Sequence, residues 1–165
     1  MAALKKNIKK NKARIAIVAA SFNDYVTKGL LYACLMELQR QGVAKEQITT
    51  VWVPGSFEVP LVALRLAKRK NIDAVICLGA VIRGETYHFE VVANECARGV
   101  MQASLLSGKP VIMGVLTTDT VAQAQARAGG KSNNKGRDAA NAALEMIALL
   151  HRLPLSAADR LLNLQ

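Results

Sequence analysis

Nearly continuous apolar stretches alternate along the chain with stretches in which apolar residues recur every three or four positions. The continuous stretches are rich in Val and Ile, which is typical of buried strands, and they cover residues 14–20, 47–53, 73–81 and 111–116. The periodic stretches predict helices over residues 24–41, 56–70, 87–106, 120–128 and 136–150. The pattern therefore predicts a strand followed by a helix, four times over.

The helical stretches also indicate their inner faces and their ends. Ser56 is placed to cap the second helix, and Pro60 then lies in its first turn, where a missing N–H group costs little. After Pro154, residues 156–159 resemble a capping box and predict a short terminal helix. The residues expected to face the core are Leu31, Cys34, Leu35 and Leu38 in the first helix and Ala140, Leu144, Ile147 and Leu150 in the last long one.

Alternating strands and helices favour one fold class. They predict an α/β protein, a three-layer α/β/α sandwich around a four-stranded parallel sheet of the flavodoxin-like type, with right-handed crossovers. The chain has 165 residues and no internal linker, so residues 13–165 are expected to form a single domain. Residues 1–12 form a basic N-terminal arm outside it.

The formal net charge of +10 arises from 22 Lys and Arg against 12 Asp and Glu. Five of the 22 basic residues are lysines in the arm of residues 1–12, which has no acidic residue. We interpret this arm as a solvated segment rather than one that recognises a nucleic-acid sequence. No apolar run approaches the roughly 20 residues of a membrane span, and no secretory signal follows the arm. The expectation is a cytoplasmic protein with no membrane or specific nucleic-acid partner.

Cysteine and histidine usage excludes some kinds of site. Cys34, Cys77 and Cys96 form no C-x-x-C pattern and lie in apolar stretches, so we expect buried free thiols in a reducing compartment. The two histidines, His88 and His151, are far apart in the sequence and lack nearby ligands of the kind a zinc site needs. No metal site is predicted.

Polar and aromatic residues follow each predicted strand directly. They occupy positions 21–23, 54–58, 83–88 and 117–119. The carboxyl ends of parallel strands meet at one edge of a sheet, and ligands of such sheets bind beyond that edge. The four loops therefore predict a small-molecule site there.

The third loop has glycines at the spacing of a phosphate-binding P-loop, but Glu85 stands where the lysine belongs. A nucleoside triphosphate site is therefore excluded, and the lack of a G-x-G-x-x-G motif argues against a dinucleotide site. Gly84 and Thr86 at a helix N-terminus suit an anion, although a plain capped helix has the same pattern. His88, one turn into this helix, could transfer protons near neutral pH or be structural.

The remaining candidates each admit two interpretations. Phe22 could stack on a flat heterocycle or pack as a staple on the next helix. Glu58 could accept hydrogen bonds from sugar hydroxyls or only complement a helix dipole. Arg127 and Lys135 could clamp a phosphate, with Asp138 holding either one, or form a solvated surface pair.

Four of these segments together resemble the 6,7-dimethyl-8-ribityllumazine synthase family of riboflavin biosynthesis. They read VPGSFEVP at 53–60, GAVIRGETYHFE at 79–90, GVLTTDT at 114–120 and RAGGKSNNKGRDAA at 127–140. The resemblance extends over about residues 14–150. It implies condensation of 5-amino-6-ribitylaminouracil with 3,4-dihydroxy-2-butanone 4-phosphate, releasing phosphate and water, without a metal or organic cofactor.

The resemblance also implies a role for each candidate residue. Phe22 would stack on the pyrimidine ring, and the ribityl chain and its surroundings would be held by Asn23, Ser56, Phe57 and Glu58. Backbone groups of Ala80, Val81 and Ile82 would read the uracil edge.

For the second substrate, the phosphate would be held by Gly84, Glu85 through its backbone, Thr86 and Arg127. His88 would shuttle protons during imine formation, phosphate elimination and ring closure. Lys135 and Asp138 would complete the edge of the site, and Asp138 would orient Arg127. Met113 stands where the family commonly has an aromatic residue that contributes to a neighbouring subunit's site, and Ser21 stands where a basic residue is common.

Self-association is a further implication. Members of the family form pentamers with sites at subunit interfaces, and some form a sixty-subunit icosahedral shell, for which the break at 129–134 has a suitable length. Riboflavin synthase is a potential partner. Two other functions remain open. One is an archaeal-type riboflavin synthase, which Thr86 and Arg127 disfavour because the dismutation of two lumazines involves no phosphate substrate. The other is a protein that carries a lumazine or flavin, or that forms an encapsulating shell.

Overall fold

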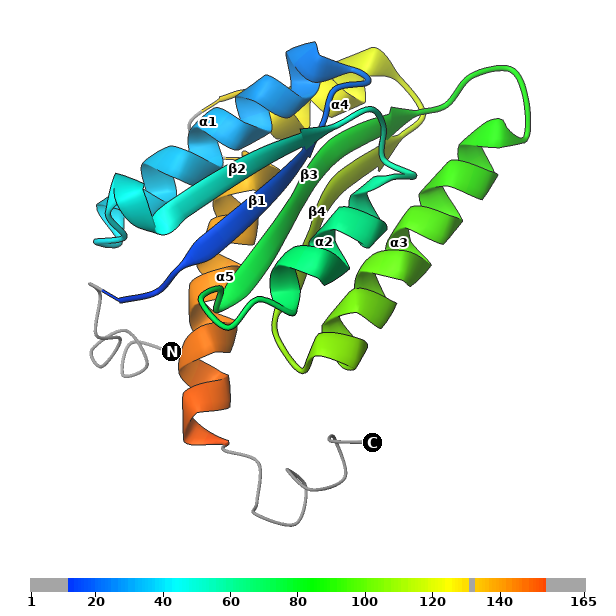
Figure 1. The fold of residues 1–165 in the computed structure, drawn as a ribbon. Coiled ribbons are helices and arrows are strands. Elements are labelled where there is room, and N and C mark those ends of the chain that lie inside the picture. Colours follow the sequence, from blue (N-terminus) through cyan, green and yellow to red (C-terminus); the bar gives the residue numbers. More distant parts are fainter. Residues whose placement is uncertain (1–11, 131–132, 154–165) are drawn as a thin grey trace.

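The computed structural model describes residues 12–130 and 133–153. Its four strands are all parallel and lie in the order β2-β1-β3-β4 (Figure 1). Their bounds are β1 Ile15–Ala20, β2 Ile48–Val53, β3 Ala74–Ile82 and β4 Val111–Thr118. The predicted α/β fold class is confirmed, and the sheet with helices on both sides is flavodoxin-like.

Five α-helices cover the sheet within the described part of the chain. Helices α1, α4 and α5 pack on one face, and α2 and α3 pack on the other (Figure 1). Their bounds are α1 Asp24–Arg40, α2 Val59–Ala67, α3 His88–Ser107, α4 Val121–Ala128 and α5 Lys135–Arg152.

The two central strands, β1 and β3, are buried from both sides. Ile17 and Ile76 contact the side of α1 and α5, whereas their neighbours Val18 and Cys77 contact the side of α2 and α3. Successive side chains of a strand point to opposite faces, so continuous apolar sequence is what a central strand between two helical layers requires.

Several boundaries differ from the prediction. Helix α2 begins at Val59 instead of residue 56 and ends at Ala67, with Glu58 rather than Ser56 at its N-cap. Pro60 does lie in its first turn, as predicted. Helix α5 begins at Lys135, one residue earlier than predicted, because the Asn134 side chain accepts a hydrogen bond from the Gly136 N–H at 2.9 Å and caps the helix.

The inner face of α1 is rotated relative to the prediction. Leu30, Cys34 and Leu38 are fully buried, whereas Leu31 and Leu35 are only half-buried at its flank. In α5, Ala140, Leu144 and Ile147 are buried and Leu150 is half-buried. The rotation follows from the close approach of α5, because Gly136 lies directly against the backbone of Leu30.

A single 3-10 turn, Lys45–Gln47, was not predicted. Its Gln47 side chain accepts a hydrogen bond from the Ala44 N–H at 2.9 Å and donates one to the Ala13 carbonyl at 3.1 Å, which ties the start of β2 to the start of β1. The three cysteines are buried, as predicted. The arm up to residue 11 and the predicted terminal helix after Pro154 lie outside the described residues.

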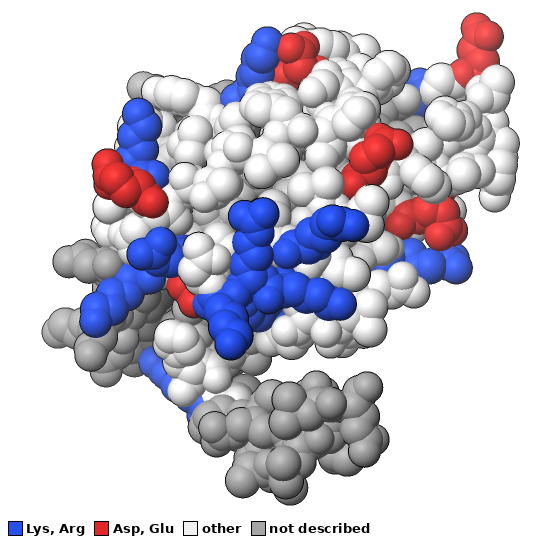
Figure 2. Space-filling view, in the orientation of Figure 1, with Lys and Arg blue, Asp and Glu red and all other residues white. Residues whose placement is uncertain are grey.

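Exposed Lys and Arg side chains gather at the edge of the sheet where the strands begin. Arg65, Lys68, Arg69 and Lys70 are all exposed near the end of α2, and Figure 2 shows the cluster in this region. The opposite edge in this view carries both signs of charge. Within residues 12–130 and 133–153, no helix is long and apolar enough to cross a membrane.

Candidate functional site

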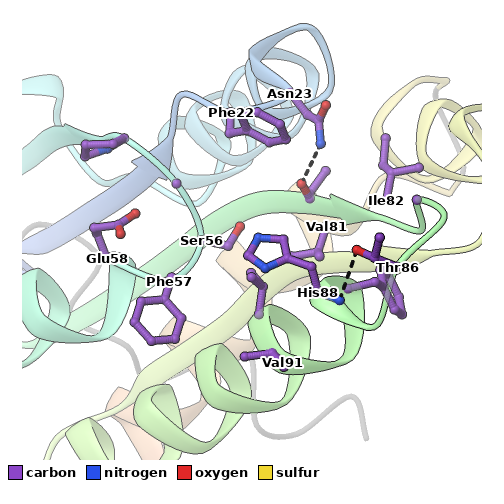
Figure 3. Close-up of a pocket in the computed structure, with 16 residues that line it drawn as sticks. Phe22, Asn23, Ser56, Phe57, Glu58, Val81, Ile82, Thr86, His88 and Val91 are labelled. Atoms are coloured by element: carbon purple, nitrogen blue, oxygen red, sulfur yellow. Dashed lines mark hydrogen bonds between the residues drawn. The ribbon is translucent and has the colours of Figure 1, made fainter.

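A pocket of about 720 Å³ opens at the edge of the sheet where β1, β2 and β3 end (Figure 3). This is the edge at which parallel sheets bind ligands, and the volume suits a small organic molecule. The predicted site residues that line it are Phe22, Asn23, Ser56, Phe57, Glu58, Ala80, Val81, Ile82, Gly84, Thr86 and His88.

The loop after β1 supplies an exposed ring and a strained backbone. The Phe22 side chain is 72% exposed beside the pocket. Asn23 has a left-handed backbone (φ 61°), and its Nδ2 donates to the Ala80 carbonyl at 2.9 Å (Figure 3). Asn tolerates this conformation better than most residues. The Asn23 amide thus fixes the β1 loop on the end of β3, a contact that the sequence did not reveal.

The loop after β2 forms the opposite wall. The Phe22 N–H donates to the Pro54 carbonyl at 2.9 Å, so this loop and the β1 loop are joined at their backbones. Ser56 is buried because β3 has glycine at position 79: a Cβ atom there would lie 3.0 Å from Ser56 Oγ. Phe57 is 55% exposed, and the Glu58 carboxylate lies on the pocket wall at the start of α2.

The loop after β3 brings an imidazole to the pocket. Helix α3 begins at His88, one residue later than predicted, so His88 is its first residue and does not lie one turn inside it; the His88 side chain points into the pocket (Figure 3). Its backbone N–H donates to Thr86 Oγ1 at 3.4 Å. Gly84 and Thr86 therefore lie at the N-terminus of a 20-residue helix, where backbone N–H groups and the helix dipole favour an anion.

The other predicted residues lie in a second, shallower cleft. This cleft has a volume of about 430 Å³ and lies between β4, the end of α4 and the start of α5. The predicted residues that line it are Met113, Arg127, Lys135 and Asp138. Glu85 lines neither the pocket nor the cleft, and its side chain is exposed.

Asp138 pairs with Lys135, one of the two partners considered for it, and not with Arg127, the partner that the resemblance implied. Asp138 Oδ2 accepts from Lys135 Nζ at 2.9 Å, one turn away on the same helix. Arg127 instead donates from Nη1 to the Gln123 carbonyl at 3.0 Å on its own helix. The two contacts join residues three and four positions apart on one helix, so neither needs a tertiary arrangement.

The pocket and the cleft have no lining residue in common. The predicted phosphate site, which combines Gly84 and Thr86 with Arg127, is therefore divided between two cavities of one chain. Among the described residues, no three His, Cys, Asp or Glu side chains come together in a way that could hold a metal ion.

The structure adds apolar pocket residues that were not predicted. Phe89, Val91 and Val92 line the pocket from the first turns of α3, and Pro54 and Gly55 line it from the β2 loop. The helical spacing of Val91 and Val92 from His88 is three and four residues, which places them on the same face. That spacing could have identified them once His88 was taken as a site residue.

An apolar pocket with a few convergent polar groups at the carboxyl edge of a parallel sheet defines a small-molecule site of the kind found in α/β enzymes. The family model for 6,7-dimethyl-8-ribityllumazine synthase matches residues 12–151. The chain belongs to this family of riboflavin-biosynthesis enzymes.

Curated relatives carry the same name. A 6,7-dimethyl-8-ribityllumazine synthase of Protochlamydia amoebophila (strain UWE25) is 50% identical over 145 residues, which cover 88% of this chain and 84% of the relative. Proteins of that name from two strains of Thermus thermophilus are each 54% identical over 140 residues, covering 85% of this chain and 89% of theirs.

Proposed function

We propose that this protein condenses 5-amino-6-ribitylaminouracil with 3,4-dihydroxy-2-butanone 4-phosphate to give 6,7-dimethyl-8-ribityllumazine, phosphate and water. The observation that carries the proposal is the pocket, which has an exposed ring at Phe22, a carboxylate at Glu58 and an imidazole at His88 around one volume of about 720 Å³. These groups suit a flat heterocycle, a polyol chain and a proton transfer.

In this proposal the uracil substrate binds at the loops after β1 and β2. Phe22 would stack on its ring, and Asn23, Ser56, Phe57 and Glu58 would hold the ribityl chain. The strand end at Ala80, Val81 and Ile82 would read the uracil edge through backbone groups. The Ala80 carbonyl also accepts a hydrogen bond from Asn23.

The phosphate of the second substrate would lie at the N-terminus of α3, on Gly84, Glu85 through its backbone, and Thr86. His88 is the first residue of that helix, and its side chain points into the pocket (Figure 3). It would accept and return protons as the amine forms an imine, phosphate leaves and the ring closes. Most of the rate would come from holding the two substrates together.

The division between pocket and cleft supports a site shared by two copies of the chain. In this proposal Met113, Arg127, Lys135 and Asp138 of one copy complete the pocket of its neighbour, where Arg127 reaches the phosphate. Large apolar side chains exposed on the outer side of α2 and α3 are consistent with burial in an assembly; they are Leu61, Met101, Leu105 and Leu106. A pentamer fits the proposal, and a sixty-subunit shell, a riboflavin synthase partner and a cytoplasmic location remain predictions.

The first experiment is a direct assay. Purified protein is mixed with both substrates in the presence of EDTA, and lumazine absorbance is followed against the same mixture without protein, since the substrates also react slowly on their own. Formation well above this background supports the proposal, and the chelator tests the expectation that no metal is needed. Background-only formation by folded protein would contradict the proposal and favour a lumazine or flavin carrier, or an encapsulating shell.

The same preparation tests for the riboflavin synthase activity, the dismutation of two lumazines. Incubation with 6,7-dimethyl-8-ribityllumazine alone would give riboflavin only if the protein dismutates two lumazines. We expect no riboflavin, because the anion position at Gly84 and Thr86 has no role in a dismutation without a phosphate substrate.

A further inference from the structure

The segment that joins β3 to α3 carries site residues but packs against little of the protein. Residues 83–88 are all exposed, and a Cβ atom at Gly84 would meet no other atom within 4 Å. Figure 1 shows this segment extending beyond the edge of the sheet. The position of this segment therefore depends on contacts at its two ends, where it leaves β3 and where it enters α3. The same contacts determine the position of His88 at its far end.

Arg83 makes contacts at both of these ends. Its backbone N–H donates to the Thr118 carbonyl at 2.9 Å, and its Nε donates to Asp119 Oδ1 at 2.7 Å, which binds it to the end of β4. Its Nη1 pairs with the Glu90 carboxylate in the first turn of α3. The guanidinium also lies over the Phe89 ring, 4.1 Å from its centroid.

The charges of this cluster reinforce its geometry. The hydrogen bond from Arg83 holds the pKa of the Glu90 carboxyl below its ordinary value, and Glu90 and Asp119 raise the pKa of Arg83. A single exposed ion pair contributes little to stability. Here one planar guanidinium serves two carboxylates and a ring at once, which restricts its direction in a way that a lysine could not.

We propose that Arg83 is a positioning residue that fixes His88 in the pocket by docking the first turn of α3 onto the end of β4. This inference rests on the proton-transfer role proposed above for His88. Phe89 and Glu90, the two residues that follow His88, are both held by Arg83. The imidazole thus lies at the start of a helix whose first turn is held in place by one side chain. This matters for the rate, because a displacement of about 1 Å at a reacting group can slow a reaction by about 100-fold.

The first test is kinetic. Arg83→Gln keeps a polar side chain but loses the charge, and we expect kcat to fall about tenfold because His88 is no longer held in place. The KM for the uracil substrate should change by less than about twofold, since Phe22, Ser56 and Glu58 come from other loops. Asp119→Asn, which weakens one of the contacts, should have a smaller effect in the same direction.

The matched control is Arg98→Gln. Arg98 pairs with Glu95 at 3.6 Å on the same helix, three residues away and more than two turns from the entry of α3. The variant removes an arginine–glutamate pair without touching that entry, so kcat should stay at the wild-type level. An Arg83→Gln protein with wild-type kcat would overturn the proposal.

The second test asks whether Arg83 acts through His88. In a His88→Ala background, Arg83→Gln should cost less than a further factor of about two, because residues that act as one unit are not additive. Losses that multiply in the double variant would show that Arg83 acts by another route, and the proposal would be wrong.

A readout without turnover keeps the two proposals distinguishable. Hydrogen exchange measured by mass spectrometry should be faster over residues 84–92 in Arg83→Gln than in the wild type, and unchanged there in Arg98→Gln. If His88→Ala leaves turnover intact, the role proposed for His88 fails and the exchange experiment decides on Arg83 alone. Faster exchange then supports the docking of α3, and unchanged exchange overturns it.

Discussion

The pocket at the ends of β1, β2 and β3 and the cleft beside β4 are built in different ways. The pocket is walled by strand ends and two loops joined at their backbones, and one of its lining residues, Ser56, is buried. The cleft is smaller, and its charged residues Arg127, Lys135 and Asp138 bind to partners on their own helices. The pocket is therefore preformed, whereas the charged groups of the cleft are held by local contacts that a ligand can replace.

This difference indicates which of the two cavities, the pocket or the cleft, needs a neighbouring copy of the chain. A preformed pocket can bind a ring and a chain with the groups of one subunit. Side chains that satisfy one another locally can exchange these contacts for a phosphate at small cost, because exposed ion pairs contribute little. The comparison predicts that the pocket governs ring recognition and that the cleft acts on the phosphate of a neighbouring site.

The largest effect is expected from mixing two impaired variants and assaying them at a butanone phosphate concentration well below its KM, where each variant alone has lost most of its activity. Assemblies formed from equal amounts of His88→Ala and Arg127→Ala chains should recover about a quarter of wild-type activity, because each site then draws its two residues from independently chosen copies. The control mixes Phe22→Ala with His88→Ala, which alter the same pocket, and should show no more activity than the average of the two variants alone. Equal recovery in both mixtures, or in neither, would show that the pocket and cleft are not joined between copies.

His88→Ala alone should slow lumazine formation by about 10- to 100-fold, at the lower end of what acid–base groups provide, since both substrates can still be placed. The measurement is kcat under saturating substrates, with uracil-substrate binding followed separately by fluorescence. Binding that weakens as much as kcat falls would mean that His88 shapes the pocket instead of moving protons.

Arg127→Ala should act on the second substrate. We expect the KM for the butanone phosphate to rise about tenfold, as the loss of one charge-assisted hydrogen bond implies, with little change for the uracil substrate. Inhibition by inorganic phosphate should weaken in parallel. Unchanged phosphate inhibition would remove Arg127, and with it the cleft, from the phosphate site.

Acid should weaken the contact between α1 and α5. Glu37 on α1 is buried and accepts from Arg40 at 2.7 and 2.8 Å and from Gln41 at 3.0 Å, and Gln41 in turn contacts Asn141 of α5 at 3.4 Å. The hydrogen bonds from Arg40 lower the pKa of Glu37. The unfolded chain therefore takes up this proton at a higher pH than the folded chain, so the stabilisation is present at neutral pH and is lost as the pH falls below about 4.

Glu37→Gln measures the size of this contribution. At pH 7 it should lower the free energy of unfolding by about 1–2 kcal/mol, because it weakens charge-assisted hydrogen bonds of a buried group. The stability difference between the variant and the wild type should shrink toward pH 3. Urea denaturation at both pH values provides the measurement, and a difference that is constant with pH would contradict a lowered pKa at Glu37.

The smallest effect is expected at the cysteines. Burial raises the pKa of Cys34 to about 12 and that of Cys96 to about 11, and it also raises the pKa of Cys77. Cys34 lies in the core under α1 and α5, and the other two lie in the core under α2 and α3. All three thiols should resist a thiol reagent in the native protein at pH 8 and react in urea. Selective reaction of Cys34 would show that the side of the cleft opens more readily.

Much of the fold and of the site could be read from the sequence because the relevant rules are local. The strand and helix periods predicted the order of the elements, and the position of polar residues after each strand placed the site at the correct edge. The missed boundaries depend on contacts that are remote in sequence. Ser56 is a poor predictor of the helix start because it is drawn under the site against Gly79, 23 residues away.

By itself, then, the sequence determined the α/β fold class, the edge that carries the site, the buried thiols and the candidate residues, through side-chain period and the chemistry of each loop. Only the tertiary structure decided how these residues are grouped. It divided them into pocket and cleft and joined Asn23 to Ala80. It also docked Arg83 on the end of β4 and the start of α3. The physical reason is that grouping depends on the direction and distance of side chains from different elements, which no spacing along the chain encodes.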